Sequence, residues 1–110
     1  MMRALLLAAV AATLVAAPAT AGTSKTVTVG SNFYAPAKLT VKAGDKVRFA
    51  WEGGSIIPHD VSVKKGPVKF KSPIQAAGTY TRKLRKPGTY VLQCTVHPAE
   101  MQLTIKVKKR

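Results

Sequence analysis

The sequence contains little cysteine, few acidic residues and, after residue 21, no long apolar run, and these absences restrict what the protein can be. Its 110 residues include a single cysteine, Cys94, so the chain cannot form an internal disulfide. Acidic residues are scarce: 4 Asp and Glu stand against 18 Lys and Arg, a formal net charge of +14. After residue 21, no apolar run approaches the roughly 20 residues of a membrane-spanning helix. These absences exclude a disulfide-stabilised fold and leave stability to the core and to any bound metal.

The first 21 residues have the organisation of an export signal. Arg3 supplies a positive start, residues 4–17 form an apolar run interrupted only by Thr13, and residues 19–21 read Ala-Thr-Ala, a small-x-small cleavage pattern. We expect a signal peptide at 1–21 and one domain at 22–110, exported to the periplasm, the cell envelope or the extracellular space. The mature form would have no transmembrane span. The alternative is an uncleaved membrane anchor.

Beyond residue 21, apolar residues alternate with polar ones at the period of a half-buried strand. The alternating runs lie at 26–29, 38–42, 46–51, 59–63, 90–94 and 102–108. Turn residues, chiefly Gly, Pro and Asp, separate them. This pattern predicts an all-β fold, a Greek-key antiparallel β-sandwich of seven to eight strands. Residues 66–77 have no clear period, so a loop, a short helical turn and an edge strand all fit there.

Every Cys, His and Met residue after the signal falls into two short segments. One holds His59, and the other holds Cys94, His97 and Met101 in the spacing Cys-x-x-His-x-x-x-Met. Two imidazoles, a thiolate and a weak axial thioether are the blue-copper donor set. We therefore predict a metal site made of these four residues. Copper is favoured over zinc because the thioether is a soft ligand and copper lies higher in the general affinity order.

Strand alternation also predicts where two of these donors point. His59 is followed at even spacing by Val61 and Val63, and Cys94 is preceded at even spacing by Leu92. Residues two apart on a strand share a face. We therefore expect His59 and Cys94 to face the sandwich interior near one end. The loop after Cys94 and the start of the last strand would supply the other two donors.

Residues 88–98, Gly-Thr-Tyr-Val-Leu-Gln-Cys-Thr-Val-His-Pro, resemble a strand and copper loop of the plastocyanin/azurin (cupredoxin) family of small type 1 copper proteins. In that family Gly-x-Tyr-x-(Phe/Tyr)-x-Cys-x-x-His is usual, and the resemblance spans residues 25–107. It implies one copper ion cycling between Cu(I) and Cu(II), with His59 and His97 as imidazole ligands, Cys94 as thiolate and Met101 as axial thioether. It also implies an apolar electron port around His97. The residues assigned to that port are Pro36, Ile57, Pro58, Pro98 and Ala99.

Three features depart from the usual family pattern. Asp60 follows the first histidine, where the family often has an Asn that ties the two ligand loops together. A carboxylate there would either stabilise Cu(II) or cap a turn. The Cys94-to-His97 spacing is plastocyanin-like, whereas the three residues between His97 and Met101 are azurin-like, so the loop is short. Leu92 replaces a more usual aromatic residue, which we expect to be a packing change.

These observations favour an exported, monomeric copper protein that transfers single electrons between redox partners. Four protein ligands leave no open coordination position, so we do not expect an enzyme. Copper carriage, buffering or resistance is the alternative, and a metal-free basic sandwich is a third. The positive charge favours acidic redox partner proteins or an anionic envelope surface. Nucleic acid is not expected, because export removes the protein from it and the basic residues are not interleaved with aromatic ones.

Overall fold

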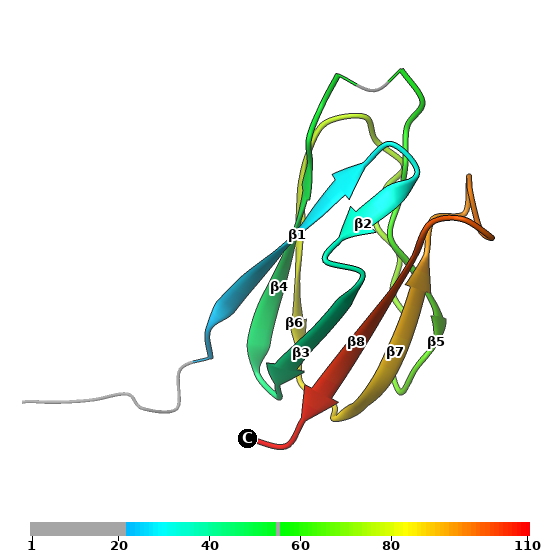
Figure 1. Ribbon diagram of the computed structural model, residues 1–110. Coiled ribbons are helices and arrows are strands. Elements are labelled where there is room, and N and C mark those ends of the chain that lie inside the picture. Colours follow the sequence, from blue (N-terminus) through cyan, green and yellow to red (C-terminus); the bar gives the residue numbers. More distant parts are fainter. Residues whose placement is uncertain (1–21, 55) are drawn as a thin grey trace, which may run out of the picture.

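The computed structural model describes residues 22–54 and 56–110, and the predicted signal peptide lies outside these residues (Figure 1). Within the described part of the chain, no helix could cross a membrane. The regular elements are the strands β1 (Ser24–Gly30), β2 (Phe33–Ala35), β3 (Lys38–Lys42), β4 (Asp45–Trp51), β5 (Ser62–Lys65), β6 (Gly78–Leu84), β7 (Gly88–Gln93) and β8 (Gln102–Lys108).

The strands form two sheets of four, with the orders β2-β1-β4-β6 and β3-β8-β7-β5. The predicted all-β sandwich is therefore confirmed. Four of the six strand pairs are antiparallel, as expected for this fold, whereas β1 runs parallel to β4 and β3 runs parallel to β8. The chain passes from β1 and β2 into the opposite sheet as β3 and returns as β4. The alternation of apolar and polar residues reveals which face of a strand is buried, but not which strand lies next to it in the sheet. The sequence therefore did not show these parallel pairs.

The core lies between the sheets and follows the predicted alternation. In β4, Val47 and Phe49 are buried while Lys46 and Arg48 are exposed. The same pattern recurs in β8. Burying one such large apolar side chain stabilises the fold by roughly 1.5–3 kcal/mol. Cys94 belongs to this apolar cluster, so the predicted thiolate ligand is also a packed core residue.

The stretch 66–77, which lacks a clear period, runs beside the segment that carries His59, here called the first ligand segment. His59 and Gln75 exchange two backbone hydrogen bonds of 3.0 and 2.9 Å, and the Ser72 amide donates to the Val61 carbonyl at 2.8 Å. Only isolated bridges form, so no regular strand is assigned. Pro73 lacks an amide hydrogen and interrupts the ladder between them. Of the three alternatives, the loop is therefore the observed one, with two isolated bridges to the neighbouring segment.

The two ends of the sandwich are formed by different sets of turns and strand ends (Figure 1). The ligand end consists of the segments 31–33, 52–60, 72–77 and 94–101, of which residue 55 is not described. The basic end consists of the turns 43–44 and 85–87 and of the C-terminal residues, together with the strand ends that lead into them. A seven-residue strand such as β4 spans roughly 23 Å between these ends.

Asp45 joins three chain segments at the basic end. Its carboxylate is 3% exposed and accepts hydrogen bonds from the backbone amides of Thr23 and Lys42, both at 2.9 Å. It also pairs with Arg110. The hydrogen bond from Lys42 is the main cause that lowers the pKa of Asp45, and burial opposes it. The carboxylate therefore holds β1, the 43–44 turn and the C-terminus together in its charged form.

Replacing Asp45 by asparagine is expected to lower the free energy of unfolding at pH 7 by about 1–3 kcal/mol, the usual value of hydrogen bonds to a charged group. Because the pKa is lower in the folded than in the unfolded state, the charge stabilises the fold above about pH 4. This contribution is lost as the pH falls through the folded pKa. Urea unfolding should therefore show the deficit of Asp45→Asn shrinking from pH 7 to acid pH.

The matched control is Glu52→Gln, which removes one negative charge from an exposed side chain. It should change the free energy of unfolding by less than about 0.5 kcal/mol. An Asp45→Asn deficit that stays constant or grows as the pH falls would contradict the role assigned to the charge.

Candidate metal centre

The four predicted donors lie together at the ligand end. His59 precedes β5, Cys94 follows β7, His97 lies in the next loop, and Met101 directly precedes β8. His59 is 2% exposed, Cys94 and Met101 are fully buried, and the His97 side chain is 19% exposed. The inward orientation predicted for His59 and Cys94 is confirmed by this burial. His97 alone reaches the surface.

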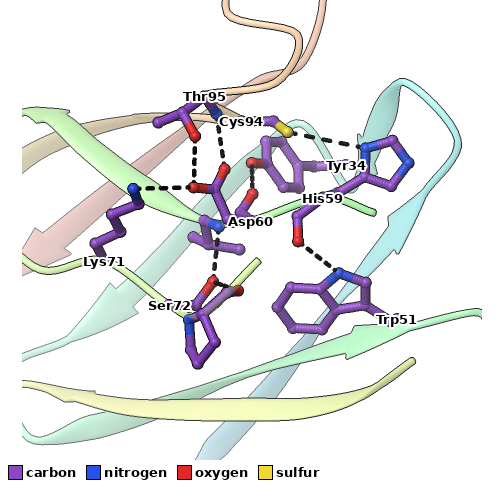
Figure 2. Close-up of polar contacts among 10 residues, drawn as sticks. Tyr34, Trp51, His59, Asp60, Lys71, Ser72, Cys94 and Thr95 are labelled. Carbon is purple, nitrogen blue, oxygen red and sulfur yellow. Dashed lines mark hydrogen bonds and ion pairs between the residues drawn. The ribbon is translucent and has the colours of Figure 1, made fainter. Parts of the chain in front are cut away.

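Three of the donors approach one another closely. Cys94 Sγ lies 3.8 Å from His59 Nδ1, as Figure 2 shows. The His59 and His97 rings are 5.2 Å apart between centroids and inclined by 44°. Among the described residues, His97 Nε2 is buried with no hydrogen-bond partner. A buried ring nitrogen without a partner is rare in folded proteins, and here its ring lies beside a second imidazole.

These features fit a soft metal ion. A thiolate and imidazoles are the ligands that copper prefers, and His97 has a nitrogen that no group in the described part of the chain satisfies. Within residues 22–54 and 56–110, no three His, Cys, Asp or Glu side chains already meet as a metal cluster. Binding would therefore draw the donors closer than they stand. His97 is the least constrained of them, with only Glu100 Oε1 facing its Nδ1, at 4.0 Å.

Tight turns in the backbone bring Cys94 and Met101 together. The Cys94 amide donates to the Met101 carbonyl at 3.1 Å. The His97 amide donates to the Cys94 carbonyl at 3.1 Å, and the Met101 amide donates to the His97 carbonyl at 3.0 Å. The spacing Cys-x-x-His-x-x-x-Met is thus the spacing of a closed loop. Its two ends lie side by side although six residues separate them.

Two aromatic side chains hold the first ligand segment in place. Trp51 Nε1 donates to the His59 carbonyl at 3.1 Å, and the Tyr34 hydroxyl donates to the Asp60 carbonyl at 2.6 Å (Figure 2). Sequence reasoning missed this role, because it treated Trp51 only as part of an alternating strand. Buried indole and phenol groups usually find a polar partner, and that tendency is the signal that could have pointed to them.

Tyr34 remains a hydrogen-bond donor at all ordinary pH values. Burial is the main cause that raises the pKa of its phenol, and electrostatic interactions with Cys94 and Asp60 raise it further. Burial also lowers the pKa of His59, an effect that His97 reinforces and Asp60 opposes. The neutral imidazole is the form that binds a metal, so the environment of His59 favours the ligand form.

Asp60 links the two ligand segments directly. It is fully buried, and its two carboxylate oxygens accept hydrogen bonds of 2.7 Å from the backbone amide and the hydroxyl of Thr95 (Figure 2). Lys71 Nζ lies 3.7 Å from one oxygen. We expected Asp60 either to stabilise an oxidised metal or to cap a turn. The observed contact is a bridge from the residue after His59 to the residue after Cys94.

The comparisons with known proteins agree with this geometry. The profile of the cupredoxin-like domain family matches residues 3–107. Amicyanin-alpha from Methylorubrum extorquens is 33% identical over 84 residues, which cover 73% of this chain and 68% of that protein. Plastocyanin from Prochlorothrix hollandica is 35% identical over 96 residues, which cover 76% of this chain and 71% of that protein.

Solved structures give the same result. An oxidised amicyanin variant superimposes with a TM-score of 0.66 at 26% identity, over 76% of this chain and 81% of that one. A copper-containing nitrite reductase from Thermus scotoductus superimposes with a TM-score of 0.68 at 29% identity. That match covers 78% of this chain but only 22% of the reductase.

Proposed function

Because the chain belongs to the cupredoxin family, we propose that it is an exported type 1 copper protein that carries single electrons between redox partners. The observation that carries this proposal is a buried thiol 3.8 Å from His59 Nδ1, beside an imidazole with an unsatisfied buried nitrogen. The cofactor is one copper ion, which supplies a one-electron couple between Cu(I) and Cu(II) when bound. The proposed ligands are His59, Cys94 and His97, with Met101 as the axial donor.

The proposed role of the fold is to hold the four metal donors in fixed positions. Both ligand segments are fixed by hydrogen bonds from neighbouring chain, including those from Trp51 and Tyr34 and the bridge through Asp60. Donors that are held by their backbones need little rearrangement when the charge at the site changes. Full burial of Cys94 and Met101 also keeps water from the sulfur donors. These features favour rapid electron exchange.

The ligand end is also suited to brief contact with another protein. Of the residues that the structure describes, the large apolar ones that stay exposed lie there: Phe33, Ile56, Ile57, Ile74 and Val96. Ile57 was among the predicted port residues, and the other four were not. Exposed apolar patches of this kind mark interaction sites. We propose that redox partners contact this patch and that electrons pass through His97.

Replacing Val96 by lysine is expected to slow electron self-exchange roughly tenfold or more. Val96 is 40% exposed and lies next to His97, so two copies meeting at this patch would bring like charges together. NMR line broadening in mixtures of the oxidised and reduced protein measures the exchange rate. Thr89→Lys adds the same charge to the exposed face of β7 and is the control. Equal slowing in both variants would contradict a port at the ligand end.

Copper carriage, the alternative function, needs donors that exchange readily. The burial of Cys94 and Met101 favours retention of the metal instead. A loaded protein that yields its copper quickly to a chelator and exchanges electrons slowly would support carriage. Slow release with fast self-exchange is the result expected for an electron carrier.

A further inference from the structure

Positive charge is concentrated at the basic end, the end farthest from the metal donors. The cations gathered there are all exposed: Lys42, Lys46, Lys83, Arg85, Lys86, Lys108, Lys109 and Arg110. They come from segments far apart in the sequence, namely the strands and turns around 43–44 and 85–87 and the C-terminal residues. In Figure 1 this is the end that carries the C-terminus.

This charge is almost uncompensated. The acid at this end is Asp45, which is 3% exposed and already occupied by two backbone amides and Arg110. Among the cations of the basic end that the structure describes, only Arg110 has a carboxylate partner. The strand register even places Lys46 opposite Lys83. Like charges directly opposite each other destabilise a sheet, so the fold gains no stability from this arrangement.

The ligand end has the opposite character. Its four segments contain no Lys or Arg, and they hold the exposed acids Glu52 and Glu100. An acidic protein attracted by the net charge would therefore arrive roughly 23 Å from the donors, at the wrong end for electron transfer. Of the two partner types predicted from the charge, an acidic redox protein and an anionic surface, this placement favours the surface.

The composition of the basic end suits a lipid surface better than a protein. Six of its eight cations are lysines, and Lys is depleted from protein–protein interfaces whereas aromatic residues and Arg are enriched. Clusters of four to eight Lys and Arg are the usual feature that attracts proteins to anionic lipids. Such attraction requires a cluster of positive charge on one face and does not need shape complementarity. The basic end provides such a cluster.

A hollow beside the 85–87 turn adds a second reason. It has a volume of about 410 Å³, and its lining includes Phe70, Leu84, Arg82, Arg85 and Lys86, with the Arg82 guanidinium 4.8 Å from the centre of the Phe70 ring. A phospholipid headgroup offers a phosphate for these cations.

We propose that the basic end docks on a bilayer surface that contains anionic phospholipids. Docking in this orientation points the ligand end away from the bilayer, where soluble partners can reach it. The docking itself does not depend on the proposed electron transfer; only the consequence for partners does. The contact is electrostatic, so it is reversible and weakens as salt shortens the Debye length from about 10 Å at 0.1 M to about 3 Å at 1 M.

The test uses the copper-loaded chain from residue 22 to residue 110, which contains all eight strands. It is sedimented with vesicles of phosphatidylcholine alone or of phosphatidylcholine mixed with phosphatidylglycerol. The variant K42Q/K86Q/K108Q removes three cations from the basic end. The variant K38Q/R48Q/K64Q removes three exposed cations from elsewhere and has the same net charge. Each lysine near an anionic surface strengthens binding roughly fivefold.

We expect binding to the mixed vesicles only, a loss of about 100-fold or more in the first variant, and a far smaller loss in the second. Acetylation mapping on the vesicles should protect Lys42, Lys86 and Lys108 while Lys38 and Lys64 stay reactive. Equal losses in both variants would overturn the proposal in favour of diffuse attraction. Absence of vesicle binding with tight binding to a polyglutamate chain would overturn it in favour of an acidic protein. Since no electron transfer is measured, either result leaves the proposed function to its own tests.

Discussion

Replacing Cys94 by serine is expected to abolish the intense visible absorption of the copper-loaded protein. That absorption arises from a Cu(II)–thiolate bond, and Cys94 is the only cysteine of the chain. A serine hydroxyl cannot supply a thiolate, although His59 and His97 remain to hold a metal. Copper affinity should also fall by more than about 100-fold, because even losing an outer partner of a ligand costs 10- to 100-fold. Absorption spectra with stoichiometric copper give both results.

The substitution is nearly isosteric, so the metal-free variant should still fold. Urea unfolding of the metal-free forms checks this. Gln93→Ser is the matched control, since it changes the adjacent residue, which is at the end of β7 and is not a proposed donor. It should keep the absorption. If Cys94→Ser also kept the absorption, the thiolate would not be a ligand and the proposed centre would be wrong.

Replacing Asp60 by alanine is expected to cause the largest loss of stability among single substitutions at the ligand end, about 2–4 kcal/mol. The carboxylate is fully buried and accepts both of its 2.7 Å hydrogen bonds from Thr95. Alanine removes the bridge between the segments that carry His59 and Cys94. The free energy of unfolding of the metal-free protein, measured in urea, gives the loss. Copper affinity should fall in parallel, by roughly 10- to 100-fold.

Asp60→Asn separates the bridge from the charge. An asparagine oxygen can still accept from the Thr95 amide, and the Thr95 hydroxyl can rotate to accept from the new side-chain amide. We therefore expect this variant to lie within about 1 kcal/mol of the parent. An Asn variant as unstable as the Ala variant would show that the charge facing Lys71, 3.7 Å away, is what matters. Asp60 would then not be a neutral bridge of the kind that Asn forms elsewhere in the family.

Particular residues show how much of the fold and of the candidate site could be predicted from the sequence. Alternation correctly placed His59 and Cys94 on the inner face, because the burial of a strand residue depends on the parity of its position. It did not reveal that β1 lies beside β4, since pairing depends on the path of the chain between sheets. It also missed Tyr34 and Trp51 as supports, because their partners are backbone carbonyls, which no sequence pattern identifies.

The location of the positive charge in the fold could not be predicted from the sequence either. Composition predicted a strongly basic protein, and counting residues could not show that the cations avoid the ligand end. That segregation follows from the strand register, which brings the ends of β3, β4, β6 and β8 to the same end of the sandwich. Asp60 is similar: the sequence identified an unusual residue, and only the fold showed that it contacts Thr95, 35 positions later.

The indole that supports the first ligand segment gives the protein an optical reporter of its own. Trp51 is the only tryptophan of the chain, it is buried, and its ring nitrogen is bonded to the carbonyl of His59. Its fluorescence therefore comes from one place, in contact with the backbone of a proposed copper ligand. Opening of that segment, quenching by a bound metal and global unfolding can each be followed through this single side chain without attaching a probe.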